Sequence, residues 1–204
     1  MDIEYFENNS FTYGKINNCL NKKEIKSLRE IFNWLYPNLK SPEKTGSATD
    51  DDGKYKKKNL AYFLNETIPV HPLTQQLEQK YFKSIQKTNS QVRQDSVFYA
   101  ALSTNWSGVL MSYYNKDDDG YKPHTDCSII TCIMWFDLFK KNFTGGDLYL
   151  PQIGVTIPPI HNTGVIIPGH MIHEVKPINI IDKNNSLGGR LAISIFCGHG
   201  SGGQ

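Results

Sequence analysis

The stretch YYNKDDDGYKPHTDCSIITCIMWF, residues 113–136, joins two apolar, strand-like runs through a polar turn. The turn ends in His124 and Asp126, two strong metal-binding groups two positions apart. If a strand starts near residue 121, its period-two alternation places both side chains on the same face. The alternative is an ordinary turn in which Asp126 accepts a hydrogen bond from a backbone amide. The stretch therefore predicts two strands and poses the question of a metal between them.

The same pattern of short apolar runs separated by turn residues continues on both sides of this stretch, from residue 95 to residue 197. Short segments rich in β-branched and aromatic residues alternate with Gly, Pro, Asn and Asp, which is typical of many short strands. These segments are SVFYAAL, GVLMSYY, SIITCIMWF, DLYL, GVTI, GVIIP, HEVKPI and RLAISIF. They predict a β-sandwich or jelly roll.

Two helices are expected before the strands. Residues 21–36 have apolar positions at helical spacing, and Asn21 with Glu24 resembles a capping box. Residues 72–88 open on Pro72, which suits the first turn of a helix. Helices followed by strands predict an α+β fold in which the N-terminal helices pack on one sheet.

Length and composition predict one domain with a sizeable core, since the chain has 204 residues of which 39% are hydrophobic. We expect helical support from residues 1–94, the jelly-roll core from residues 95–197 and a frayed tail at residues 198–204. The formal charge of +2 gives no electrostatic case for a nucleic acid or a membrane partner. The acidic, polar start does not resemble a signal peptide, and a cytoplasmic protein is predicted.

Residues 41–58 carry no apolar period and many charges, including the basic run Lys54 to Lys58. They are interpreted as a solvated connection, with a lid over a substrate as the alternative. No pair of cysteines forms a CxxC motif, so all four are predicted to be reduced, buried thiols. They are Cys19, Cys127, Cys132 and Cys197.

A third metal ligand is expected in GVIIPGHMIHEVKPI, residues 164–178, which offers His170 and His173. Two imidazoles and one carboxylate form a facial triad, which leaves three positions of an octahedral Fe(II) open. His173 is preferred because it opens the HEVKPI strand, whereas His170 follows Pro168 and Gly169 in a turn. His71, His161 and His199 are interpreted as ordinary residues outside any motif.

Arg190 begins the apolar strand RLAISIF, and alternation places it on the same side as Ala192, Ser194 and Phe196. An arginine on the interior face needs an anionic partner, because an unpaired buried charge is very costly. A small dicarboxylate would serve, held by a bidentate guanidinium contact, with Ser194 adding a hydrogen bond. The alternative is that Arg190 lies at the strand edge and reaches solvent.

The ordered set Tyr114, Gly120, Tyr121, His124 and Asp126, followed by GGDLYL, HEVKPI and RLAISIF, resembles the Fe(II)/2-oxoglutarate-dependent dioxygenases. Within them it is most similar to the prolyl hydroxylase-like branch. The resemblance covers about residues 95–197 and implies a double-stranded β-helix, that is, a jelly roll with helices packed outside it.

The resemblance also implies site residues. It gives His124, Asp126 and His173 as ligands of iron, and Arg190 as the partner of the distal carboxylate of 2-oxoglutarate, with Tyr114 beside it. A further family position falls near Ile133 or Trp135, and Trp135 is taken as a contact with the co-substrate together with Ser194. Trp135, Met134 and Ile133 would form the apolar wall. The segment between His173 and Arg190 is longer than is usual in the family.

The implied reaction consumes 2-oxoglutarate and O2 at Fe(II), releases succinate and CO2, and hydroxylates an unactivated C–H bond. Ascorbate is an optional further requirement. The expected substrate is a prolyl residue in a peptide or protein; the alternative is a free amino acid or another small molecule. The sequence leaves the oligomeric state open.

Two other classes of function remain as alternatives. The first is a calcium loop of the EF-hand type, because Asn115, Asp117, Asp119, Gly120 and Asp126 occupy its ligand and glycine positions. Strand-like flanks argue against it, since an EF-hand needs a helix on each side. The second is a non-catalytic jelly-roll binding module, in which Arg190 would face outward.

Overall fold

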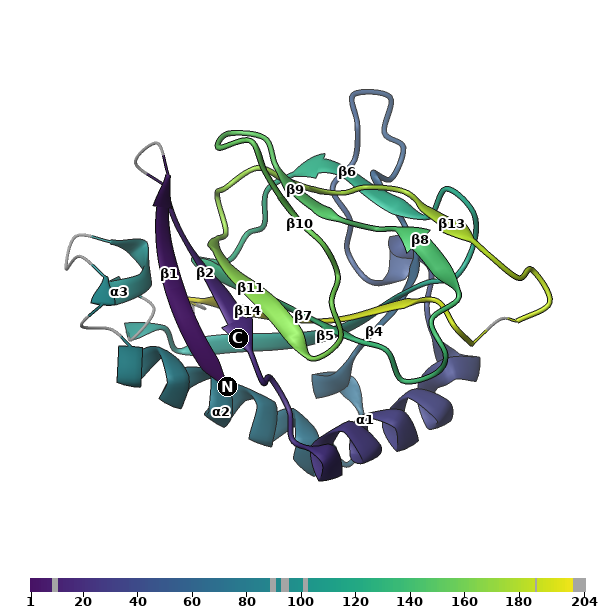
Figure 1. Cartoon of the computed structure of the whole chain (residues 1–204), viewed down its shortest axis with the longest axis horizontal. Helices are drawn as coiled ribbons and strands as arrows, with labels where there is room; N and C mark the ends of the chain where they lie inside the picture. Colours follow the sequence, from purple (N-terminus) through teal and green to yellow (C-terminus); the bar gives the residue numbers. More distant parts are fainter. Residues whose placement is uncertain (9–10, 89–90, 93–95, 101–102, 186, 200–204) are drawn as a thin grey trace.

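Two antiparallel β-sheets face each other in the computed structural model of the chain and form a jelly roll (Figure 1). The structure describes residues 1–8, 11–88, 91–92, 96–100, 103–185 and 187–199. The larger sheet has the order β1 (Asp2–Asn8), β2 (Phe11–Asn17), β11 (Thr163–Pro168), β7 (Ile130–Phe136), β14 (Arg190–Gly198), β5 (Trp106–Tyr114), β4 (Leu60–Phe63). The smaller sheet has the order β10 (Val155–Ile157), β9 (Leu148–Leu150), β12 (His173–Val175), β6 (Gly120–His124), β3 (Lys57–Lys58).

The chain crosses repeatedly between the two sheets. From β5 it passes to β6, returns to β7, crosses to β9 and β10, returns to β11, crosses to β12 and returns to β14. A separate pair, β8 (Phe143–Gly145) with β13 (Ile178–Ile180), extends one end. This alternation confirms the predicted double-stranded β-helix.

Both long helices lie on the outer face of the larger sheet, as expected (Figure 1). They are α1 (Lys22–Leu35) and α2 (Pro72–Thr88). The capping box of α1 is confirmed, because the Asn21 side chain accepts from the Glu24 amide at 3.0 Å and the Glu24 carboxylate accepts from the Asn21 amide at 2.6 Å. Short 3₁₀ turns follow at Tyr36–Asn38, Pro42–Lys44 and Leu64–Glu66.

Strand β7 is buried on both faces and separates two apolar cores. Cys132 and Met134 face the helices, whereas Ile133 and Trp135 face the space between the sheets. Period-two alternation forces this division. The prediction that Met134 belongs to the wall of the site is therefore wrong.

The N-terminal segment differs from the expected helical support. β1 and β2 form a hairpin, and β2 pairs with β11 at the edge of the larger sheet. Gly14 permits close packing there, since a Cβ at this position would lie 2.4 Å from Ile166 Cγ2. The alternation of polar and apolar residues from Asp2 to Tyr5 is the sequence signal that could have predicted the first strand of this hairpin.

The segment SVFYAAL is not the predicted strand, because Val97–Ala100 forms the short helix α3. Ser96 caps it, with its hydroxyl oxygen accepting from the Phe98 amide at 3.3 Å. Phe98 is buried edge-on against Tyr5, with ring centroids 5.3 Å apart. A serine cap and one anchoring aromatic thus outweigh the strand propensity of the run. Residues 101–102 of the run lie outside the described residues.

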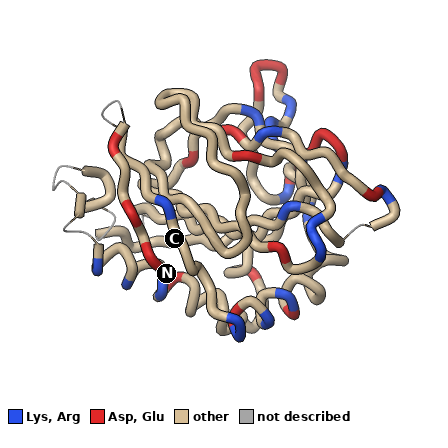
Figure 2. The backbone as a smooth tube through the Cα atoms, in the orientation of Figure 1, with Lys and Arg blue, Asp and Glu red and all other residues tan. Residues whose placement is uncertain are grey.

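The loop of residues 41–58 is more ordered than the predicted solvated connection. It contains a bridge between Thr49 and Tyr55 and ends in β3, which pairs with β6. Figure 2 shows its acidic tip above a basic stem, within a surface where both signs of charge are scattered. The stem lies against the smaller sheet, so the loop belongs to the body of the fold.

Three cysteines, Cys19, Cys132 and Cys197, are buried free thiols as predicted. Cys127 is also free but exposed, so the prediction of burial is wrong for this residue. It follows Asp126 in the turn after β6, where the chain leaves the sheet. Gly198 ends β14, and residues 200–204 of the expected tail lie outside the described residues.

Within the described part of the chain, none of the helices has both the length and the apolar character needed to cross a membrane.

Candidate metal centre and ligand cavity

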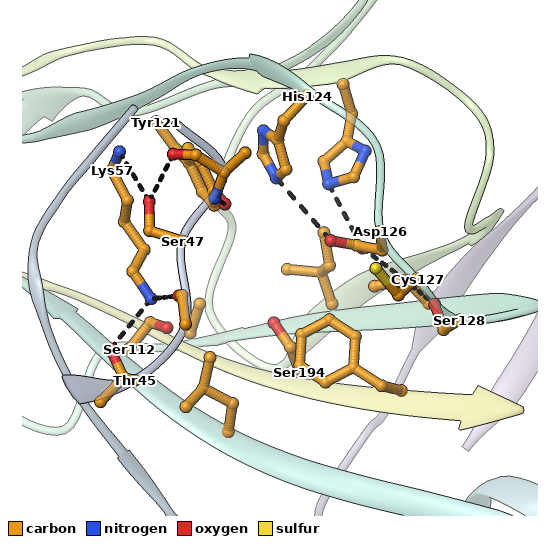
Figure 3. A pocket seen from close by; sticks show the side chains of 18 of the residues that line it. Thr45, Ser47, Lys57, Ser112, Tyr121, His124, Asp126, Cys127, Ser128 and Ser194 are labelled. Carbon is orange, nitrogen blue, oxygen red and sulfur yellow. Dashed lines mark hydrogen bonds and ion pairs between the residues drawn. The ribbon is translucent and has the colours of Figure 1, made fainter. Parts of the chain in front are cut away.

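His124 and Asp126, which are near each other in sequence, meet the distant His173 in one group. Figure 3 shows His124 and Asp126 in the wall of the cavity. His124 ends β6 and His173 opens β12, and the two are cross-strand partners. Asp126 lies between them, with Nε2 of His124 3.8 Å from Oδ1 and Nε2 of His173 3.5 Å from Oδ2. The candidate ligand atoms of the three residues all lie within 4.8 Å of one another. One cation can therefore contact all three.

Hydrogen bonds orient both imidazoles toward that common point. Nδ1 of His124 lies 2.8 Å from the Lys122 carbonyl oxygen, and Nδ1 of His173 lies 3.0 Å from the Met171 carbonyl oxygen. A carbonyl only accepts, so each Nδ1 carries a proton, and in the neutral ring Nε2 is then the nitrogen with a free lone pair. This is the tautomer that a metal requires.

Asp126 is positioned by a turn and not by strand alternation, because β6 ends at His124. Its backbone amide donates to the Gly169 carbonyl at 2.8 Å, and the Thr131 hydroxyl donates to Oδ2 at 2.6 Å. Gly169 is required for this approach, since a Cβ on it would lie 1.8 Å from the Ser128 carbonyl oxygen.

The electrostatics of the group favour a neutral imidazole at His124. Burial, followed by the neighbouring His173, lowers the pKa of His124 to about 3. The Tyr121 ring stacks on His124 with centroids 3.4 Å apart and an interplanar angle of 13°. Protons therefore do not compete with a metal for His124 at neutral pH.

A cavity of about 610 Å³ extends from this group into the space between the sheets. As alternation predicts, Arg190, Ala192, Ser194 and Phe196 all line it. Most of its wall is apolar, supplied by residues such as Phe63, Leu110, Ile133 and Val175.

Arg190 lies in the cavity with only 1% of its surface exposed. Its Nε donates to the Gly146 carbonyl at 2.8 Å, and its Cζ lies 4.9 Å from the Tyr114 ring centroid and 6.0 Å from that of Trp135. Among the described residues, neither Nη2 of Arg190 nor Nε1 of Trp135 has a hydrogen-bond partner. Two buried donors without acceptors are costly, and an anionic acceptor between the sheets would satisfy them.

Tyr114 and Ser194 also line the cavity. Burial raises the pKa of Tyr114 to about 12, so its phenol stays protonated and able to donate. The predicted roles of both residues toward a co-substrate stay predictions.

Other candidates from the sequence lie elsewhere. His170 is exposed and does not join the metal group that the described residues form. The calcium loop is also wrong: Asp119 accepts from the amides of Asn115 and Lys116 at 2.9 and 3.0 Å. Asp117 pairs with Lys183 at 2.9 Å. These carboxylates bond within the turn and to Lys183, and the turn is flanked by the strands β5 and β6 and not by the helices of an EF-hand.

Sequence reasoning missed the rim of the cavity. Residues of the loop after residue 41, together with Trp106, Cys127 and His199, contribute to the lining. Lys57, read as part of a solvated basic run, is buried there. Only the pairing of Lys57 with Tyr121 in neighbouring strands places it there, and no local pattern encodes that pairing.

The two facing sheets, between which the chain alternates, define the double-stranded β-helix fold. The His–Asp–His group lines the cavity between them. Among solved structures this chain is similar to a prolyl hydroxylase from Trichoplax adhaerens in complex with a hypoxia inducible factor oxygen degradation domain peptide fragment. The identity is 16%, the TM-score is 0.63, and the match covers 91% of this chain and 82% of that one.

Two further prolyl hydroxylases share the fold. A prolyl-4-hydroxylase from Pseudomonas putida is 12% identical with a TM-score of 0.59, covering 93% of each chain. A viral collagen prolyl hydroxylase from Paramecium Bursaria Chlorella virus-1, in a 2OG complex, is 14% identical with a TM-score of 0.55, covering 91% of this chain and 94% of that one. No protein-family model and no curated protein matches the chain.

Proposed function

We propose that the protein is an Fe(II)- and 2-oxoglutarate-dependent dioxygenase that hydroxylates an unactivated C–H bond and releases succinate and CO2. One observation carries this proposal. The same cavity holds a His–Asp–His group at one point and, lining its wall, a buried arginine whose Nη2 has no acceptor among the described residues. A metal and a dicarboxylate would satisfy both features.

The donor set fits iron. Two neutral imidazoles and one carboxylate suit Fe(II) and leave coordination positions for other ligands, whereas a structural zinc site is closed by four protein ligands. No fourth His, Cys, Asp or Glu joins the group among the described residues. His124, Asp126 and His173 would therefore hold the metal.

The part of the cavity wall at Arg190 fits a carboxylate. The guanidinium of Arg190 offers charge and the free Nη2 donor, and the indole N–H of Trp135 offers a second donor nearby. Gly146 and the Tyr114 ring hold the guanidinium in place. Arg190 would thus anchor 2-oxoglutarate and fix its orientation toward the metal.

Bound iron and 2-oxoglutarate supply the oxidising chemistry with O2. The protein supplies geometry: Thr131 holds one oxygen of Asp126, and the backbone carbonyls at residues 122 and 171 hold the two imidazoles. The apolar wall excludes water from the reacting region. Ascorbate would act only as an optional reductant.

The proposed substrate is a prolyl residue in a peptide or protein. The support is the likeness in fold to prolyl hydroxylases, of which the Trichoplax enzyme was solved with a peptide. A free amino acid or another small molecule is the alternative, because the cavity is largely apolar and accepts either.

Anaerobic addition of Fe(II) and 2-oxoglutarate tests the site without knowledge of the substrate. We expect a visible charge-transfer absorbance in the wild type that is lost in His124→Ala and in Arg190→Ala. His170→Ala is the matched control, since His170 is exposed and outside the metal group, and should keep the band. Persistence of the band in both site variants would refute the proposal.

A further inference from the structure

A second buried cation lies in the cavity. Lys57 on β3 has only 4% of its surface exposed and lines the same cavity as His124 and Asp126. Figure 3 shows its side chain on the opposite side of the cavity from Asp126, beside Thr45. Lysine is almost never fully buried unless it is paired, so its presence there calls for a partner.

The contacts of Lys57 are neutral. Its Nζ donates to the Gly46 carbonyl at 2.7 Å and to the Thr45 hydroxyl at 3.1 Å, and it lies 6.0 Å from the Tyr121 ring centroid. Lys57 takes part in none of the ion pairs found among the described residues. An ammonium has three donors, and the two hydrogen bonds use only two of them.

Lys57 nevertheless carries charge at neutral pH. Burial lowers its pKa to about 8, and Asp126 acts in the opposite direction. At pH 7 the ammonium is therefore mostly protonated, inside an apolar cavity where an unpaired charge is expensive.

With metal and co-substrate bound, the ammonium of Lys57 is the charge in the cavity that has no counter-charge. The divalent metal and Arg190 carry positive charge, and Asp126 and the dianionic co-substrate carry an equal negative charge. These four charges therefore sum to zero. Asp126 is the only acidic side chain among the described residues that line the cavity. The positive charge of Lys57 is thus left without compensation once metal and co-substrate are bound.

We infer that Lys57 binds a carboxylate of the substrate, so that the molecule to be hydroxylated brings one negative charge into the cavity. This inference rests on the proposed function and narrows its substrate class. The third N–H of Lys57 would donate to the carboxylate in a charge-assisted hydrogen bond. A free amino acid, a C-terminal residue and an acidic side chain next to the target are the three sources of such a group.

A purely structural role for Lys57 makes a different prediction. If the ammonium only ties residues 45 and 46 to the stem of the loop, its loss would weaken binding of charged and neutral ligands alike. If it binds a carboxylate, its loss would affect the charged ligand alone. Matched acid and amide pairs therefore separate the two roles.

The experiment uses the full chain loaded with Mn(II) and N-oxalylglycine, which do not turn over, and calorimetric titration. Three pairs of probes distinguish the sources: L-proline with L-prolinamide, acetyl-Ala-Pro acid with its amide, and an amidated Pro-Glu peptide with its Pro-Gln counterpart. We expect the wild type to prefer the charged member of at least one pair by about tenfold or more.

Substitutions at Lys57 test whether this residue causes the preference for the charged ligand. Lys57→Met should abolish it and Lys57→Arg should retain it. Lys58→Met is the matched control, because the neighbouring lysine is exposed and does not line the cavity. Lys57→Gln, which keeps a neutral donor for the loop, should bind the amides like the wild type and lose the preference for the acids.

The outcomes separate this inference from the proposed function. If the anaerobic Fe(II) and 2-oxoglutarate absorbance forms in wild type and in Lys57→Met, the proposed function stands. No preference in any pair, or a preference that survives Lys57→Met, then overturns the role of Lys57 alone. Loss of that absorbance in Lys57→Met would also overturn it, because Lys57 would then belong to the co-substrate site. An absence of the band in wild type would overturn the proposed function, and this inference with it.

Discussion

Gly146 and Arg190 fit together so closely that only a glycine can occupy position 146. Arg190 Nε donates to the Gly146 carbonyl at 2.8 Å, and a Cβ on Gly146 would lie 2.7 Å from Arg190 Cδ. Gly146 also has a φ of +76°, which disfavours other residues. Gly146 of the GGDLYL motif therefore fixes the position of the guanidinium.

Gly146→Ala should displace Arg190 and weaken 2-oxoglutarate binding about tenfold or more, because the guanidinium loses its backbone acceptor and its position. Anaerobic titration of the charge-transfer absorbance measures this. Gly154→Ala is the matched control: its φ is +65°, and a Cβ there meets no atom within 4 Å. Both variants place alanine at a positive φ and so share the backbone strain. Equal affinity for 2-oxoglutarate in the two variants would therefore contradict the claim that Gly146 positions Arg190.

Arg190→Met should separate stability from binding. In the absence of ligands it removes a buried charge that forms no ion pair among the described residues and keeps an apolar stem, so the free energy of unfolding should stay within about 1 kcal/mol of the wild type. Affinity for 2-oxoglutarate should fall about a hundredfold or more. Urea denaturation and anaerobic titration give the two values. A loss of several kcal/mol without ligand would show that Arg190 is structural instead.

Thr131→Val should weaken metal binding about tenfold to a hundredfold, because the hydroxyl that donates to Asp126 Oδ2 at 2.6 Å is lost while the shape is kept. Competition with a chelating dye measures the affinity for Mn(II). Thr163→Val makes the same change at a hydroxyl that donates only to the Ile160 carbonyl at 2.8 Å. That control should bind the metal like the wild type, and a similar loss in both would rule out a specific role for Thr131.

The metal-free protein should lose stability as the pH falls below about 6.5. The pKa of His124 is lowered to about 3 in the folded state. As the pH falls, the unfolded chain therefore binds a proton at His124 before the folded chain does, and this stabilises the unfolded state. The loss should reach on the order of 1 kcal/mol at pH 5.5 and should continue toward pH 3. Denaturant unfolding with a chelator present measures it, and His124→Gln should show a smaller loss over the same range.

The central part of the fold could be predicted because its signals are local. Helix α1 has its own cap, the strands have β-branched runs, and the interior position of Arg190 follows from alternation along one strand. The meeting of His124, Asp126 and His173 was predicted through resemblance to a family, since no local rule brings residues so distant in sequence together.

What was missed depends on contacts between distant segments. Lys57 looks like one of several surface lysines, and only its pairing with Tyr121 turns it inward. The hairpin of β1 and β2 is stabilised by the edge of a sheet formed much later in the chain. The composition of the run SVFYAAL allows a strand or a helix, and the cap at Ser96 favours the helix.

Tyr121 contacts both the His–Asp–His group and the loop of residues 41–58. Its ring stacks on His124, and its hydroxyl accepts from the Ala48 amide at 3.0 Å. Substitutions in this loop are therefore coupled to the position of His124. A change that moves Ala48 would also shift the ring that stacks on His124, so variation in the loop is constrained by the need to keep this imidazole in place.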